Sequence, residues 1–194
     1  MTELEKLRED CLNCRGCELC QTRTNVVFGV GSGDAKLMFI GEGPGENEDL
    51  QGEPFVGRAG KLLDLILESG GFSRQTNTYV ANIVKCRPPQ NRVPLPEERE
   101  ACLPWLNEQI RLADPKIIIL LGATALQGLV DPKAKISASR GQWMEWQGRA
   151  LMPTYHPAAL LRNSGLKAAV WEDIKLVVDK YRELVDPNHP CEFH

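Results

Sequence analysis

The sequence lacks the features that mark several common classes of protein. Its 194 residues contain no apolar run of membrane-spanning length, no internal repeat and no low-complexity segment. The opening residues, MTELEKLRED, are charged and have no apolar core, so we expect no secretory signal and a cytoplasmic location. The net charge of −3 provides no general excess of positive charge, so nucleic-acid binding would require a local basic face.

Nucleotide-binding loops are also missing. The segment 41–57, GEGPGENEDLQGEPFVG, is rich in glycine and follows an apolar run, but it matches neither G-x-x-x-x-G-K-[ST] nor G-x-G-x-x-G. Its acidic residues would also repel a polyphosphate. Phe55 stands between Pro54 and Val56 in this polar loop, which suits an aromatic platform for a planar ligand. A purely structural turn is the alternative.

The composition, with 42% hydrophobic and 25% charged residues, is typical of a globular domain. We place one domain at residues 1–186 and expect a loose tail at 187–194. Apolar and β-branched runs predict strands at 35–43, 77–86, 115–122 and 149–156. Helical spacing of apolar residues predicts helices at 59–71, 95–113, 123–130 and 168–185.

This alternation of strands and helices predicts the fold class. Strands that are buried on both faces and separated by helices belong to a central, mostly parallel sheet covered by helices, an α/β protein. Pro104 lies inside the helix predicted at 95–113 and should kink or break it.

Four of the seven cysteines form a pattern typical of a metal site. Cys14 and Cys17 make a C-x-x-C pair, and only folding can bring the distant Cys86 and Cys102 to it. Four converging thiolates are the ligand set of an iron–sulfur cluster or of a structural zinc ion. Two more cysteines extend the pair to C-x-x-C-x-x-C-x-x-C, which also resembles part of a ferredoxin; they are Cys11 and Cys20.

Unusual polar residues follow the predicted strands, at the edge where parallel sheets bind ligands. His156 follows a strand and precedes Pro157, a position that favours a functional histidine over a hydrogen-bonded structural one. Asn82 lies near the carboxyl end of another strand. Its amide offers both a donor and an acceptor, as reading the edge of a nucleobase requires; an asparagine that only bonds to backbone is the alternative.

Basic residues are expected on the same face, although a solvated charged surface would give the same pattern. In the segment ALLRN, Leu160 and Leu161 accompany an arginine, so they can wedge into a base stack while cations hold phosphates. The cations of this face are Arg58, Lys85, Arg87, Arg92, Arg140, Arg162 and Lys167.

Three motifs in order closely resemble those of the family 4 uracil-DNA glycosylases, the iron–sulfur branch of that superfamily. They are GEGPGENEDLQGEPFVGRAGKLLD, NIVKCRPPQNR and YHPAALLRN. The resemblance implies a three-layer α/β/α sandwich around a four-stranded, mostly parallel sheet, with an N-terminal arm tied down by a [4Fe–4S] cluster. Counted from the RT of RTNVVFG, the ligands of the family pattern are Cys14, Cys17, Cys86 and Cys102, and two cysteines depart from it, Cys11 and Cys20.

The resemblance also implies roles in removing uracil from DNA. Phe55 would stack on the extruded base, Asn82 would bond its N3–H and O4 edge, and His156 would donate to O2. A water attacking C1′ would be activated by Glu42, with help from the backbone of two glycines, Gly41 and Gly43.

Two further loop residues match positions of the family. Glu48 matches the carboxylate that fills the space a thymine methyl would need, and Asn91 of PPQNR would support the flipped nucleotide or the neighbouring backbone. The branch that bonds covalently to its product carries a reactive histidine in a basic insertion. The corresponding stretch here, PPQNRVPLPEE, has no histidine, so no covalent intermediate is expected.

The implied partner is uracil-containing DNA, single- or double-stranded, without a membrane. We expect a monomer, because no heptad pattern or extra apolar surface is visible. Two rival hypotheses from other classes stay open at this point. One is a redox carrier or sensor built on the cluster, and the other is a zinc-stapled nucleic-acid-binding module without catalysis.

Overall fold

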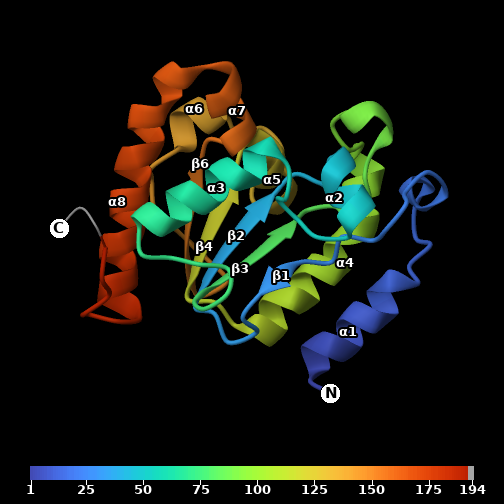
Figure 1. Cartoon of the computed structure of the whole chain (residues 1–194), viewed down its shortest axis with the longest axis horizontal. Helices are drawn as coiled ribbons and strands as arrows, with labels where there is room; N and C mark the ends of the chain where they lie inside the picture. Colours follow the sequence, from blue (N-terminus) through green and yellow to red (C-terminus); the bar gives the residue numbers. More distant parts are fainter. Residues whose placement is uncertain (192–194) are drawn as a thin grey trace.

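The computed structural model describes residues 1–191 and is built around one six-stranded sheet (Figure 1). The strand order is β1-β3-β2-β4-β6-β5. The middle four strands run parallel, and an antiparallel strand lies at each edge. The strands are β1 (Val30–Gly31), β2 (Leu37–Gly41), β3 (Thr78–Asn82), β4 (Ile117–Leu121), β5 (Met144–Trp146) and β6 (Arg149–Thr154).

The four predicted strands are the parallel centre of the sheet, but the expectation of a four-stranded sheet was wrong. The two edge strands are too short to produce an apolar run of their own. β1 has two residues, and β5 joins β6 through a tight turn in which Gln147 and Gly148 both have positive φ, 50° and 74°. These edges form because the neighbouring strand offers unpaired backbone groups, a tertiary effect.

Helices cover both faces of the sheet. One face packs against α1 (Glu3–Leu12), α4 (Pro96–Ala113) and α5 (Ala123–Leu129), and the other against α3 (Arg58–Ser69) and α8 (Lys167–Leu184). The expected three layers are therefore present, with the N-terminal helix α1 lying along α4 (Figure 1). Short helices occupy the loops: α2 (Glu46–Gln51), α6 (Ile136–Ser139), α7 (Pro157–Arg162) and the 3-10 turns η1 (Glu18–Gln21), η2 (Pro89–Asn91) and η3 (Ser164–Leu166).

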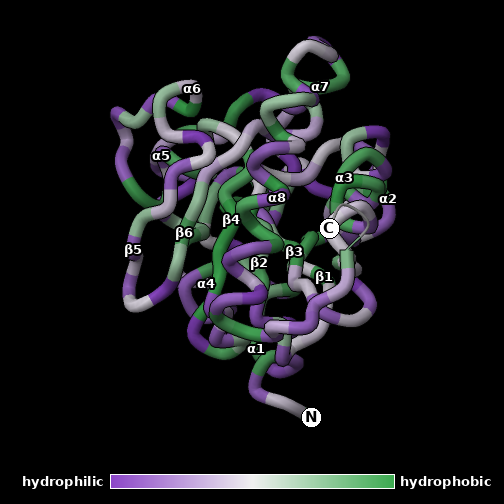
Figure 2. The backbone as a smooth tube through the Cα atoms, turned by 90° about the vertical axis from the view of Figure 1, so that its left-hand side faces the viewer, coloured by the Kyte–Doolittle hydropathy of each residue, from purple (hydrophilic) through white to green (hydrophobic). Residues whose placement is uncertain are grey.

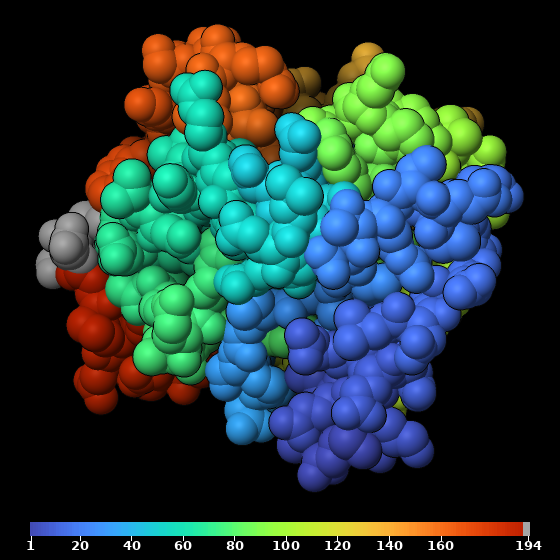
Figure 3. Space-filling view, turned by 45° about the vertical axis from the view of Figure 1, so that its right-hand side comes forward, coloured from blue at the N-terminus to red at the C-terminus, as the bar shows by residue number. Residues whose placement is uncertain are grey.

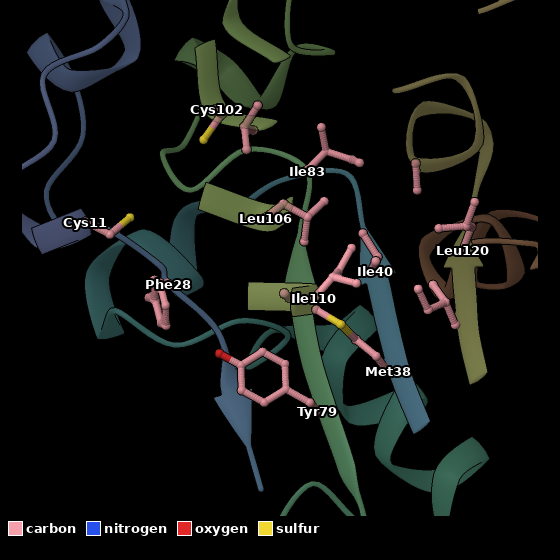
Figure 4. Packing of buried hydrophobic residues seen from close by; sticks show 14 of the residues in the cluster. Cys11, Phe28, Met38, Ile40, Tyr79, Ile83, Cys102, Leu106, Ile110 and Leu120 are labelled. Carbon is pink, nitrogen blue, oxygen red and sulfur yellow. The ribbon is translucent and has the colours of Figure 1, made fainter. Parts of the chain in front are cut away.

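The period of the strands explains the two cores. Successive side chains of β2 point to opposite faces, so Met38 and Ile40 join one cluster while Leu37 and Phe39 join the other. Both faces are buried, and the hydrophobic residues run along the central strands in Figure 2. Cys11 and Cys102 lie at the edge of the first cluster (Figure 4).

Helix α4 continues through Pro104, so of the two predicted outcomes the break does not occur. It continues from Pro96 to Ala113, although Pro104 supplies no N–H to the preceding turn. Cys102 and Leu106, on either side of the proline, are both buried against the sheet. This packing holds the helix together through the missing hydrogen bond.

The prediction of a loose tail is wrong for residues 187–191. The His189 side chain is buried, and its ring stacks on Phe72 with 4.5 Å between centroids. Its Nε2 lies 2.8 Å from the Gly70 carbonyl oxygen, and Arg182 donates to the His189 carbonyl. Residues 192–194 of the predicted tail lie outside the described part. Within the described part, none of the helices combines the length and apolar character needed to span a bilayer.

Candidate active site and cysteine cavity

A cavity of about 670 Å³ opens at the carboxyl ends of the parallel strands. We call it the strand-end cavity. All four parallel strands contribute to it: Glu42 follows β2, Asn82 ends β3, Leu121 ends β4, and His156 follows β6 by two residues. In Figure 3 the segments near residues 90 and 160 stand on either side of it, with the residue 45–55 segment between them. This is the place where the sequence predicted a ligand site.

His156 presents a hydrogen-bond donor to the cavity. It is the N-cap of α7, and its Nδ1 accepts from the Ala158 N–H at 3.1 Å. Burial and the nearby Arg162 guanidinium lower the pKa of His156 to about 4, so the ring is neutral at pH 7. Since Nδ1 is the acceptor, the proton of the neutral ring resides on Nε2. His156 thus offers one N–H donor and no charge.

Phe55 is a rigid aromatic wall of the cavity. Its ring stacks against His156 with 5.5 Å between centroids and 28° between planes. The backbone of Phe55 has a positive φ of 55°, an unusual conformation for a bulky residue. Arg74, which sequence reasoning missed, holds it by donating to the carbonyl oxygens of Phe55 and Pro54. A Cβ on Gly60 would overlap the Phe55 carbonyl, so close backbone approach requires glycine there.

Glu48 shapes the loop that carries Phe55. Its carboxylate accepts from the backbone N–H groups of Val56 and Gly57, at 2.9 and 2.8 Å, and from that of Gly45 at 3.1 Å. The side chain also lines the strand-end cavity. Glu48 therefore connects the two ends of the 45–57 loop, and its side chain also borders the cavity.

Asn82 carries an unmet hydrogen-bonding capacity. It is 2% exposed, and its Oδ1 has no hydrogen-bond partner among the described residues. Buried polar atoms are nearly always paired, so a ligand donor is expected at this oxygen. Gly41 on the neighbouring strand allows the arrangement, because a Cβ there would lie 2.5 Å from Asn82 Oδ1 and 2.6 Å from Phe55 Cζ. The base-reading interpretation of Asn82 fits this geometry better than a backbone-bonding one.

Glu42 places a carboxylate at the cavity, next to Gly43. The Thr124 hydroxyl donates to its Oε2 and fixes the orientation of the group. Thr124 belongs to α5, directly after β4, and was missed as a site residue although its segment LGAT follows a predicted strand. Glu42 Oε1, the other carboxylate oxygen, receives no hydrogen bond from Thr124.

A second cavity is lined by cysteines and lies beside the end of α1. We call it the cysteine cavity. Its walls include Cys11, Cys14, Cys17, Cys20, Cys86 and Cys102. Folding has thus brought the distant Cys86 and Cys102 to the C-x-x-C pair, as the sequence predicted. No group of three or more metal-binding side chains within residues 1–191 is arranged to hold a single metal ion.

The sulfur atoms of this cavity already receive hydrogen bonds. Arg23 Nη1 donates to Cys86 Sγ at 3.1 Å, and Trp105 Nε1 donates to Cys14 Sγ at 3.2 Å. The Lys85 N–H donates to Cys102 Sγ, also at 3.2 Å. Donors of this kind stabilise negatively charged sulfur ligands.

The electrostatics of the cavity call for positive charge. Burial raises the pKa of Cys102 to about 11 and that of Cys11 to about 12, so thiolates form here only with a compensating cation. Burial also lowers the pKa of Lys85 to about 8, although the neighbouring cysteine sulfurs oppose this shift. The donor set and the burial fit a cluster held by thiolates.

Comparison with known proteins decides the family. A family model described as the uracil DNA glycosylase superfamily matches residues 28–175. The chain belongs to the uracil DNA glycosylase superfamily. A type-4 uracil-DNA glycosylase of Thermotoga maritima is 47% identical over 176 residues, covering 89% of this chain and 91% of the relative.

Two further relatives carry the same name. The type-4 uracil-DNA glycosylase of Sulfurisphaera tokodaii is 44% identical, over 95% of this chain and 86% of its own. That of Archaeoglobus fulgidus is 40% identical, over 100% of this chain and 98% of its own. The resemblance to the family 4 glycosylases read from the three motifs is therefore confirmed.

Two residues predicted to touch DNA in this glycosylase superfamily member are buried instead. Lys85 is 1% exposed, and its ammonium donates to the Asn82 carbonyl and to Gln109 Oε1 at 2.8 and 2.5 Å. Leu160 is 3% exposed and packs against Val170 and Ile174 of α8. Both predictions were wrong, because the sequence places these residues near the carboxyl ends of strands but does not show toward which side each side chain turns.

The other predicted contact residues lie near the mouth of the strand-end cavity or on the exposed surface. Arg58, Arg162 and Leu161 are exposed, and Leu161 has 43% of its surface accessible. Arg87 is partly buried and donates to Asn91 Oδ1 at 2.7 Å. Arg92 makes a bidentate pair of hydrogen bonds to the buried Glu98 carboxylate, so one side of its guanidinium already has a partner within the protein.

Proposed function

We propose that this chain removes uracil from DNA by flipping the base into the strand-end cavity and hydrolysing its N-glycosidic bond. The product is an abasic site, and the enzyme acts as a monomer in the cytoplasm on single- or double-stranded DNA. The observation that carries the proposal is the buried Asn82 Oδ1, which has no hydrogen-bond partner within residues 1–191, beside the stacked Phe55 and His156. One acceptor, one neutral donor and one aromatic wall match the edge and face of a uracil ring.

Recognition rests on Asn82. Its Oδ1 would accept from uracil N3–H, and its amide N–H would donate to O4. Cytosine presents an acceptor at N3 and a donor at N4, so both contacts would be reversed and two buried polar groups would be left unpaired. Discrimination of this kind reaches roughly 10⁴-fold. Phe55 would stack on the ring face, which offsets part of the few kcal/mol that base flipping costs.

His156 would stabilise the leaving group. As the C1′–N1 bond breaks, its electron pair goes to uracil, and negative charge develops on O2. The Nε2–H of His156 would donate to that oxygen. Because the pKa of His156 is about 4, the ring acts as a neutral donor to an anion and does not transfer its proton. One such donor is worth about 3–4 kcal/mol in the transition state.

Glu42 would position the attacking water. The sugar left by bond breaking is oxocarbenium-like, and water must reach C1′ from the face opposite uracil. The Glu42 carboxylate, held by Thr124, would accept a proton from that water, and the backbone of Gly41 and Gly43 would help to orient it. No covalent intermediate is expected, since the loop between Cys86 and α4 contains no histidine.

Two loop residues would restrict the substrate. Glu48 borders the cavity and would exclude the methyl group of thymine. Asn91, which has a positive φ of 56° and receives a hydrogen bond from Arg87, would support the backbone beside the flipped nucleotide. Of the predicted DNA contacts we keep Arg58, Arg87, Arg92 and Arg162 for phosphates, and Leu161 as the wedge.

The cysteine cavity would hold a [4Fe–4S] cluster on Cys14, Cys17, Cys86 and Cys102. When bound, the cluster supplies a structural cross-link and takes no part in hydrolysis. It would join the N-terminal arm to the segment after β3 and to α4, which carry these cysteines. Arg23, Trp105 and the Lys85 N–H would donate to its sulfur ligands.

A strand-scission assay tests the proposal. The protein is mixed with labelled oligonucleotides that hold one uracil, cytosine or thymine, and alkali then cleaves any abasic site. We expect cleavage at uracil alone, on single or double strands, and its loss in Asn82→Ala. No cleavage on either substrate by protein with an intact cluster would overturn the glycosylase proposal and favour a redox protein.

A further inference from the structure

The buried Lys85 joins the two cavities of the molecule. It lies three residues after Asn82 and directly before Cys86, and it lines the cysteine cavity. Its ammonium donates to the backbone carbonyl of Asn82 at 2.8 Å. Since Asn82 is the last residue of β3, the chain leaves the sheet there and Lys85 supplies a donor to that carbonyl.

Every polar group of Lys85 is anchored. The N–H donates to Cys102 Sγ at 3.2 Å, and the carbonyl accepts from the Val27 N–H at 2.7 Å. The ammonium also donates to Gln109 Oε1 at 2.5 Å. Gln109 in turn donates to the Phe28 carbonyl, so the same network reaches the segment that follows the cysteine-rich arm.

A lysine ammonium that is 1% exposed depends on hydrogen-bond acceptors inside the protein. Its two side-chain partners are the Asn82 carbonyl and Gln109 Oε1. Lys85 also belongs to the wall of the cysteine cavity, where its backbone N–H donates to Cys102 Sγ. The cysteine cavity and Asn82 are therefore joined through Lys85.

We propose that Lys85 is a positioning residue that sets the backbone of Asn82 for uracil recognition and is itself anchored in the wall of the cysteine cavity. The inference rests on the proposed function. It gives the cysteine site a role in base recognition, because the site anchors the backbone of Lys85 and the Lys85 ammonium aligns Asn82. Uracil binding then depends on the state of a cavity that uracil never touches.

Lys85→Met tests this, because it keeps the length and apolar stem of the side chain and removes its charge and donors. The first readout is inhibition by free uracil, which reports on Asn82 without the chemical step. We expect the inhibition constant of uracil to rise about 10-fold, because the Asn82 amide would be displaced from its binding position. KM for uracil-containing DNA should rise by a similar factor, and kcat should fall less. The visible absorption of the cluster should shift, because a cation next to its ligands has gone.

Lys116→Met is the matched control, since Lys116 is exposed and lies at the opposite end of the sheet, directly before β4. It should leave uracil inhibition, KM and the absorption spectrum unchanged. Binding to DNA that already holds an abasic site should be equal in the wild type, Lys85→Met and Lys116→Met, because that DNA has no base for Asn82 to recognise.

Gln109→Met provides a second test if Lys85→Met fails to fold. It removes one partner of the ammonium and leaves Lys85 and the cysteines in place. We expect uracil inhibition to weaken about 3-fold at unchanged iron content. Unchanged uracil inhibition in the folded variants, with wild-type protein active on uracil, would overturn the role of Lys85. Wild-type protein without activity on uracil would instead overturn the proposed function.

Discussion

The two cavities use polar groups in opposite ways, although Asn82 of one and Cys86 of the other are only four positions apart. In the strand-end cavity, Asn82 Oδ1 is buried and has no hydrogen-bond partner among the described residues, and the His156 ring, whose Nδ1 accepts from Ala158, lines the same space. In the cysteine cavity, three of the sulfurs already accept hydrogen bonds from protein donors. A site for a passing substrate keeps bonding capacity in reserve, whereas a site for a permanent group surrounds its ligands with support.

The largest effect that separates the cavities should come from losing a cluster ligand. Cys86→Ser should abolish the iron content and lower the free energy of unfolding by more than about 4 kcal/mol, the range for loss of a metal site. Metal analysis and thermal unfolding measure both. Cys191→Ser is the control, because Cys191 lies outside the cysteine cavity, and it should keep its iron. Wild-type protein that contains zinc and no iron would contradict the cluster.

A change in the strand-end cavity should affect rate and not stability. His156→Ala removes the donor to O2 and should lower kcat about 10²- to 10³-fold, with a nearly unchanged melting temperature. His189→Ala is the matched control, because His189 is also partly aromatic-stacked but lies against Phe72 and Tyr181. It should lower the melting temperature and spare kcat. The reverse result would show that His189, and not His156, supports catalysis.

The pH dependence of stability should carry the signature of His156. Its pKa is about 4 in the folded protein and 6.5 in the ordinary state, so the unfolded chain binds the proton first as pH falls. The contribution is full above pH 6.5 and is lost as pH drops toward 4, by roughly 3 kcal/mol in total. Denaturant unfolding of wild type and His156→Asn over this range measures it. An equal dependence of the free energy of unfolding on pH in the two proteins would show that His156 is not held neutral.

The smallest effect concerns the support of Glu42. Thr124→Val keeps the shape of the side chain and removes the hydroxyl that donates to the Glu42 carboxylate. We expect single-turnover rates to fall about 10-fold, since hydrogen bonds to charged groups are worth about 1.5–3 kcal/mol. Thr124→Ser keeps a hydroxyl and should recover most of the rate. A valine variant as fast as wild type would remove Glu42 from the water-activating role.

What the sequence could predict followed from position along the strands. Glu42, Asn82 and His156 converge because parallel strands bring their carboxyl ends to one edge. The cysteine set was visible from spacing and from the family resemblance. These signals are local or topological, so the sequence alone contains them.

What could not be predicted depends on which way a side chain turns after the backbone leaves the sheet. The sequence pattern groups Lys85 with the basic residues of the DNA-binding face and places Leu160 in a polar loop, yet both are buried. The His189 segment read as loose, yet aromatic rings and the Gly70 carbonyl hold it. Arg74 and Thr124 carry no motif, because their importance comes from the neighbours that folding gives them.

The close fit of Gly41 against its two neighbours has a consequence for how this pocket can evolve. Asn82 Oδ1 and Phe55 Cζ leave no room for a Cβ between them, so strand, amide and aromatic ring form one interlocked unit. A single substitution that enlarges or redirects one member disturbs the other two. A change of base specificity would therefore need simultaneous changes in the backbone and in both side chains. As long as this glycine is kept, the base specificity of the pocket is expected to stay the same.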